Sequence, residues 1–333
     1  HYIPGARDID VEAQVERTDA PTTRAHVVLQ LADDTLKVDA DVSDSVFLPE
    51  LLGVDEPVAL TVKGLGPTRA WDGTLEARLG ERALAAATAT LRAEAVTKFE
   101  ARGAMNLLTP LFTDAMRDQL GDELRFTVDG SLTEAGLLTL TAARVDSIPA
   151  SIELAGAAHL QERTLTGNVS IAHENLRAFV TLEGTEPLPL DLRAELDGTW
   201  SALTWALDAD VAGERNAVLE GTASIEEVLA LSVTGEVRVP KVLVAEAQQE
   251  LTDEPLRLVV VASYDQNNGV LAVPEFSVGN EWASVSGSVQ ADPSDNTIQA
   301  LAQARLIDST LLNEVLVPDI DGIGTAELRV TGN

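Results

Sequence analysis

The stretch VDEPVALTVKG, residues 54–64, decides the fold of this chain. Its residues Val58, Leu60 and Val62 are apolar, and the residues between them are Ala and Thr. Side chains alternate between the two faces of a strand, so the stretch predicts a strand with one apolar face. Four later stretches repeat an acid followed by an alternating strand: GDELRFTVDG (121–130), TEPLPLDLRA (185–194), DEPLRLVVVA (253–262) and GTAELRVTG (324–332). The chain is therefore expected to consist of repeated amphipathic strands.

The acids before the first four strands give the length of the repeat. Glu56, Glu123, Glu186 and Glu254 follow one another at steps of 67, 63 and 68 residues. This period predicts one continuous repeat array over residues 1–333, with a partial unit at each end. The expected units are 1–46 (partial), 47–106, 107–173, 174–239, 240–307 and 308–333 (partial). Because the chain starts and stops close to predicted strands, we expect it to be a fragment of a longer chain.

Each unit is expected to contain several strands and one short amphipathic helix. Turn signals such as WDG at Trp71 and DPSDN at Asp292 separate the strands at hairpin spacing, which favours an antiparallel meander. Helical patterns are confined to stretches that precede the repeated strands. These stretches are SVFLPELLGV (45–54), NLLTPLFTDAMRDQLGD (106–122), PKVLVAEAQQEL (240–251) and DSTLLNEVLV (308–317).

The predicted fold class is all-β dominated: an elongated, repeating antiparallel β-groove with short amphipathic helices between the repeats. A sheet that is apolar on one face must cover that face by packing on a second sheet, closing into a barrel or curling into a trough. Aromatic residues make up only 4% of the chain, so the apolar face lacks the bulky rings that fill a thick core. This composition favours a taco-like, U-shaped trough that stays under-filled.

The residues expected to line the trough are the apolar members of the alternating strands. They are Val58, Leu60, Val62, Leu75, Leu79, Leu124, Phe126, Val128, Leu188, Leu190, Leu192, Leu203, Trp205, Leu207, Leu256, Leu258, Val260, Leu328 and Val330.

The composition argues against several other classes of function. A net charge of −31 without any Lys/Arg cluster disfavours nucleic-acid binding. The chain has no cysteine, which excludes disulfides and thiolate metal sites. No histidine has a partner at metal-ligand spacing, and no nucleophile-elbow or phosphate-loop motif occurs. We therefore expect no enzyme activity, no cofactor and no metal.

Several motifs together resemble one known family. A leucine- and proline-containing helical segment, LPELLG (48–53), leads into an amphipathic strand, and WDGTL (71–75) follows. A second such segment precedes LGDELRFTVDG (120–130), and strands such as VLEGTAS (218–224) complete the pattern. The whole chain resembles the C-terminal half of TamB, the translocation and assembly module protein of the AsmA-like group.

The resemblance implies a fold, a location and a function. TamB-like proteins are anchored in the inner membrane and stretch across the periplasm, with strands that form a taco-shaped groove with an apolar interior. They are proposed to carry phospholipid to the outer membrane, and an older proposal links them to outer-membrane protein insertion through a barrel partner. As a fragment, this chain is expected to lack the family's N-terminal anchor and the C-terminal end that meets the barrel. The resemblance therefore predicts a periplasmic segment that shields phospholipid acyl chains.

Two alternatives stay open at the level of the sequence. One is a structural or adhesin-type β-repeat stalk, since solenoids are also repetitive and rich in strands. The other is an outer-membrane protein assembly factor that binds protein partners. Lipid that co-purifies with the chain would separate lipid transport from the adhesin.

Overall fold

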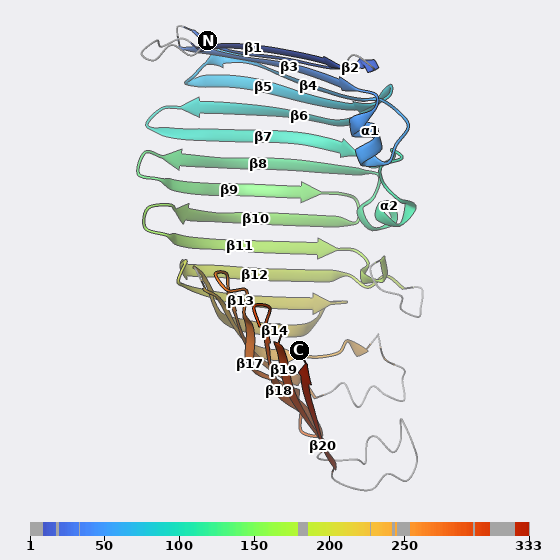
Figure 1. The fold of residues 1–333 in the computed structure, drawn as a ribbon, viewed down its shortest axis with the longest axis vertical. Coiled ribbons are helices and arrows are strands. Elements are labelled where there is room, and N and C mark those ends of the chain that lie inside the picture. Colours follow the sequence, from blue (N-terminus) through green and yellow to red (C-terminus); the bar gives the residue numbers. More distant parts are fainter. Residues whose placement is uncertain are drawn as a thin grey trace. The chain divides into compact units, whose positions relative to one another are not determined.

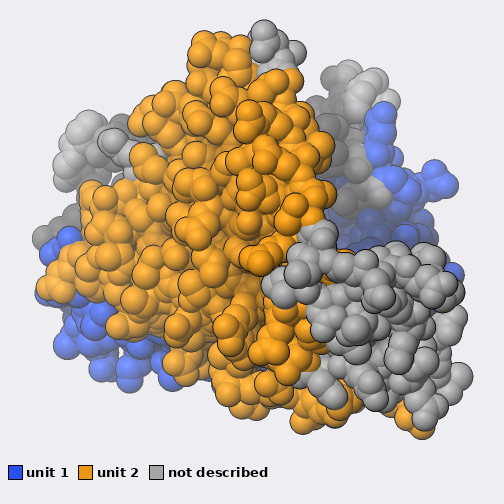
Figure 2. Space-filling view, turned by 90° about the horizontal axis from the view of Figure 1, so that it is seen from below, with its two compact units in different colours: residues 1–161 blue, residues 162–333 orange. Residues whose placement is uncertain are grey.

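The computed structural model describes residues 9–17, 20–32, 34–178, 186–226, 228–241, 244, 254–295, 297–306 and 324–332. It divides into two compact units, His1–Gln161 and Glu162–Asn333, which Figure 2 colours blue and orange.

Unit 1 contains ten strands among its described residues, and they lie side by side in chain order (Figure 1). Each strand pairs antiparallel with the next one along the chain, as the hairpin turn signals predict. The strands are β1 (Ile9–Arg17), β2 (Ala20–Ala32), β3 (Thr35–Asp44), β4 (Val58–Pro67), β5 (Ala70–Leu79), β6 (Arg82–Ala93), β7 (Val96–Asn106), β8 (Glu123–Thr133), β9 (Leu137–Asp146) and β10 (Ala150–His159).

Unit 2 also contains ten strands among its described residues, and each again pairs antiparallel with its neighbour in the chain. A short 3-10 helix, η1 (Leu176–Ala178), follows the first of them. The strands are β11 (Thr164–His173), β12 (Leu190–Thr199), β13 (Ala202–Val211), β14 (Glu214–Ile225), β15 (Val228–Val237), β16 (Leu256–Asp265), β17 (Leu271–Gly279), β18 (Ala283–Asp292), β19 (Thr297–Leu306) and β20 (Gly324–Gly332). The prediction of an all-β, antiparallel protein is confirmed.

Long connections alternate with tight turns in a regular way. A long connection follows β3, β7, β11, β15 and β19, and four strands lie between one long connection and the next. These five strands have odd numbers, so in each antiparallel unit they run in one direction and their long connections leave from the same end of the sheet. Each full repeat unit expected from the sequence spans one long connection and the four strands that follow it.

Two of the predicted helical stretches contain a helix in the structure. In the first, α1 (Phe47–Leu52) begins where the Asp44 carboxylate accepts hydrogen bonds of 2.8 Å from the backbone N–H groups of Val46 and Leu48, and it ends at Gly53 with φ 69°. In the second, α2 (Asp114–Leu120) is shorter than predicted, because the Thr113 side chain caps it by accepting from Met116 N–H. The stretch 240–251 lies largely, and 308–317 entirely, outside the described residues.

The strand predicted in TEPLPLDLRA begins later than the alternation of apolar residues suggests. β12 starts at Leu190, and Leu188 lies in the preceding connection, where its carbonyl accepts a hydrogen bond from Leu176 N–H. Pro187 and Pro189 have no N–H to donate to a neighbouring strand, which explains why pairing starts only after them. The prediction that Leu188 belongs to the strand is therefore wrong.

Neither helix of the described segments has the length and apolar content needed to cross a membrane.

Candidate functional site

The register of unit 1 gathers apolar residues on one face of its sheet. Residues directly opposite each other in an antiparallel pair point to the same face, so successive pairs can be followed from strand to strand. One such row crosses all ten strands and contains only apolar side chains and glycine. It consists of Ala13, Val27, Ala40, Val62, Leu75, Ala87, Gly103, Phe126, Val145 and Ile152. We call this face the apolar face of unit 1 and the opposite one its polar face.

Unit 2 has an apolar face of the same kind. A row of directly opposed residues again crosses ten strands without a polar side chain. It consists of Gly167, Leu196, Trp205, Gly221, Val233, Val260, Phe276, Gly287, Ala302 and Leu328. The repeated alternation in the sequence thus becomes an apolar surface that extends across the strands of each unit.

The predicted lining residues, apart from Leu188, all lie on these two faces. Unit 1 brings together Val58, Leu60, Val62, Leu75, Leu79, Leu124, Phe126 and Val128. Unit 2 brings together Leu190, Leu192, Leu203, Trp205, Leu207, Leu256, Leu258, Val260, Leu328 and Val330. Their contact with lipid stays a prediction.

Much of each apolar face is open in the described structure. On unit 2, Leu328 is 63% exposed, Ile298 53% and Ile225 46%. On unit 1, Val11 is 45% exposed and Ile152 42%. Single exposed apolar residues are common on protein surfaces, but here they recur on several strands of the same face.

One margin of each apolar face is covered. Val58 and Leu79 are register partners at the end of unit 1 where the long connections lie, and they are 7% and 0% exposed. Leu107 of the following long connection is also buried. In unit 2, Val211 at the same end of the strands and Leu188 of a long connection are buried as well. These buried residues serve packing at this margin, and Leu203, 4% exposed, is buried at the opposite end of β13.

Five aromatic rings on the apolar faces lie over glycines. In each case a Cβ atom built on the glycine would overlap with the ring, so the ring occupies the space that another residue's side chain would fill. The pairs are Trp71 with Gly64 and Gly73, Phe99 with Gly130, Phe126 with Gly103, Trp205 with Gly221, and Phe276 with Gly287. Because the rings lie against the backbone, they add apolar area without standing high above the sheet.

These glycines are the part of the site that sequence reasoning missed. The signal is present, since each glycine stands in phase with the apolar positions of its strand. Gly130, for example, follows Phe126 and Val128 at alternate positions in β8. The ring that covers it, Phe99, belongs to β7, so the pairing becomes visible only with the register.

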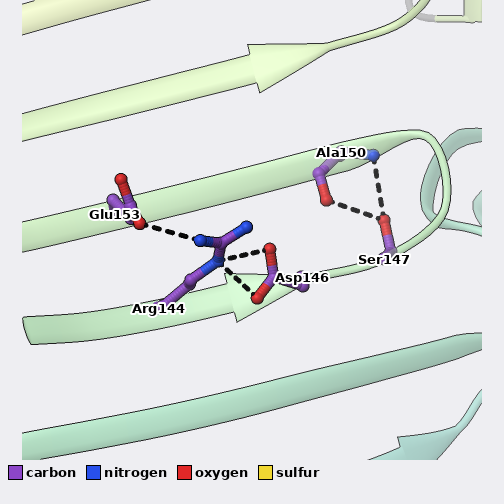
Figure 3. A network of polar contacts seen from close by, with 5 residues as sticks. All are labelled: Arg144, Asp146, Ser147, Ala150 and Glu153. Atoms are coloured by element: carbon purple, nitrogen blue, oxygen red, sulfur yellow. Dashed lines mark hydrogen bonds and ion pairs between the residues drawn. The ribbon is translucent and has the colours of Figure 1, made fainter.

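Charged side chains on the polar faces form ion pairs within the sheet or meet water, and Asp39 is an exception, since its Oδ1 is buried without a hydrogen-bond partner among the described residues. Figure 3 shows Arg144 of β9 between Asp146 of its own strand, at 2.6 Å, and Glu153 of β10, at 3.0 Å. The hydrogen bond and the charge of Asp146, followed by the charge of Glu153, raise the pKa of Arg144 above its ordinary value. Such exposed pairs contribute little to stability, so these faces consist of solvated, weakly coupled charges.

The described residues contain no group of three or more His, Cys, Asp or Glu side chains that could hold a metal ion. The feature that the two units share is an apolar face built from many similar residues. No protein-family model, no curated protein and no solved structure matches this chain.

Proposed function

We propose that the apolar faces of the two units shield the acyl chains of phospholipids. In this proposal the chain is a periplasmic segment of a lipid-transport bridge between the inner and outer membranes, and it is not an enzyme. The observation that carries the proposal is the apolar row across ten strands in each unit, whose members are half-buried or exposed. The periplasmic location, the membrane anchor of the parent protein and a barrel partner rest on the resemblance to TamB.

The energetics of an acyl chain favour a surface of this kind. Each CH₂ group exposed to water costs about 0.8 kcal/mol, so two chains exposed together cost tens of kcal/mol. A surface of Leu, Val, Ala and Ile removes part of that cost at every position along a strand. A moving lipid then makes many similar contacts in turn, which agrees with the repeated rows of apolar residues.

The proposed geometry is a trough in which the apolar face is concave and the polar face meets water. The low relief of the rings over glycine supports this geometry, because flat rings leave room for an acyl chain above the backbone. The net charge of −31 keeps the outside hydrated while the inside holds hydrocarbon.

The first test is the lipid content of the purified chain. We expect organic extraction and mass spectrometry to recover phospholipid in an amount comparable to the protein. A chain that emerges empty would favour the adhesin-type stalk. A chain that emerges empty and binds unfolded outer-membrane proteins would favour an assembly factor.

The second test compares neighbouring residues on opposite faces. A photo-crosslinker at Leu231, which is 42% exposed on the apolar face of β15, should capture phospholipid. The same group at Ser232, the next residue and therefore on the polar face, is the matched control and should not. Equal capture at the two positions would contradict the assignment of lipid to the apolar face.

A further inference from the structure

Trp71 of β5 is held in a cradle made by two glycines. Gly64 of β4 and Gly73 of β5 are register partners on the apolar face of unit 1. A Cβ built on Gly73 would lie 2.7 Å from Trp71 Cζ3 and nearer still to Cη2, and one built on Gly64 would overlap with Cζ2. For both glycines the three nearest atoms all belong to this one ring. At the other glycine–aromatic pairs a backbone oxygen also crowds the added atom.

The backbone does not require glycine at these two positions. Both residues lie in regular strands, and neither has the positive φ that favours glycine, in contrast to Gly53 and Gly80. Glycine weakens a strand interior because it has no side chain to pack and loses more freedom on folding. The cradle therefore exists for the ring.

The polar atom of the ring indicates the same purpose. Nε1 of Trp71 is buried, and among the described residues it has no hydrogen-bond partner. A buried tryptophan usually finds an acceptor for this N–H, and an unpaired one lowers stability. Stability alone therefore does not favour this placement. What the placement achieves is a flat apolar ring on the face, with its polar atom turned away from the surface.

We infer that Trp71 is a direct contact for the phospholipid acyl chain, and that Gly64 and Gly73 are positioning residues that hold its ring flat. The inference rests on the proposed function. An alanine at either glycine occupies the space of the ring and forces it up from the sheet. The raised ring then obstructs the path of an acyl chain between β4 and β6 and removes the flat contact.

The experiment is a double-mutant cycle on Trp71→Leu and Gly73→Ala, with phospholipid per protein measured by mass spectrometry. Trp71→Leu should lower the loading about threefold to tenfold, which is the effect of losing one aromatic contact. Gly73→Ala should lower it by a similar factor. In the Trp71→Leu background, Gly73→Ala should change the loading less than about twofold, because the residue through which it acts is gone.

A second measurement observes the ring directly. In a chain whose other tryptophans are replaced (Trp200→Phe, Trp205→Phe and Trp282→Phe), the fluorescence of Trp71 should be quenched by phospholipid brominated on its acyl chain. Gly64→Ala displaces the same ring from the neighbouring strand and should reduce the quenching as Gly73→Ala does. Circular dichroism verifies that each variant keeps its sheet.

Each outcome decides between two hypotheses. If Gly73→Ala lowers the loading equally with and without Trp71, or if brominated lipid leaves Trp71 unquenched, the inference is overturned while lipid binding stands. If the unmodified chain carries no phospholipid, the proposed function itself fails. Strong quenching together with a non-additive cycle supports the positioning role.

Discussion

The polar and apolar faces of strand β8 differ in the partners that their side chains find. In β8, Arg125 on the polar face has its partner Glu123 on the same strand, at 2.5 Å, and both side chains are exposed. Phe126 and Val128 on the apolar face are half-buried and meet only Gly, Ala and Val across the neighbouring strands. The polar face needs nothing but water, whereas much of the apolar face has no covering layer in the described structure. We therefore assign the proposed lipid contact to the apolar face.

The largest effect is expected from a charge on the apolar face. Val128→Asp should lower phospholipid loading at least about tenfold, because hydrocarbon must pass an unpaired carboxylate. Val128 lies opposite Ala101 and Ala143, so the short neighbours allow the carboxylate to reach water from an open face. The midpoint of thermal unfolding should therefore change by less than about 5 °C.

Thr127→Asp is the matched control, since it places the same charge one residue away on the polar face. Its loading and its melting curve should equal those of the unmodified chain. Wholesale unfolding of Val128→Asp would mean that this face is a sealed, dry core, and the proposed lipid surface would lose its main support.

A smaller effect separates the covered margin from the open part of the apolar face. Leu79→Ala should lower the free energy of unfolding by about 2–5 kcal/mol, because Leu79 is fully buried and leaves a cavity. Leu328→Ala, at a residue that is 63% exposed, should lower it by less than about 1 kcal/mol. Urea unfolding measures both, and equal losses would show that the two regions are packed alike.

On the polar face, removal of an ion-pair network should have little effect. Arg144→Ala breaks the contacts with Asp146 and Glu153, but all three side chains are at least 35% exposed. The urea unfolding curve should stay close to that of the unmodified chain, and phospholipid loading should not change. A marked fall in loading would show that the polar face also takes part in binding.

The smallest effect concerns one carboxylate at a hairpin turn. The Ser294 hydroxyl donates a 2.6 Å hydrogen bond to Asp292, and this bond holds the pKa of Asp292 below its ordinary value. The resulting stabilisation is present above the pKa of the unfolded carboxyl and is lost as the pH falls through the lower, folded pKa. Ser294→Ala should therefore raise the pKa of Asp292, which NMR titration can follow. An unchanged pKa would mean that backbone donors alone set it.

The local pattern of the chain was sufficient for the strands and for their two faces. Alternation in stretches such as residues 54–64 and 121–130 is a property of neighbouring residues. Because successive side chains of a strand point to opposite faces, this alternation predicts one apolar and one polar face. Hairpin turn signals likewise predicted antiparallel pairing, because a short turn brings adjacent strands together. The helix at 45–54 followed from its composition, but the one at 106–122 is shorter than its stretch, since Thr113 caps it.

Tertiary structure decided what each apolar residue does on its face. Leu79 and Leu328 are both leucines at apolar positions of an alternating strand. Leu79 is nevertheless fully buried and Leu328 is mostly exposed, because Leu79 lies at the covered margin of its face. The cradle of Trp71 depends on Gly64, a residue of another strand that only the register brings opposite Gly73. The sequence by itself determined which residues are apolar and how they alternate. Cross-strand pairing then decided which of them are covered, which stay open and where a ring can lie flat, because these properties depend on neighbours that are distant in the chain.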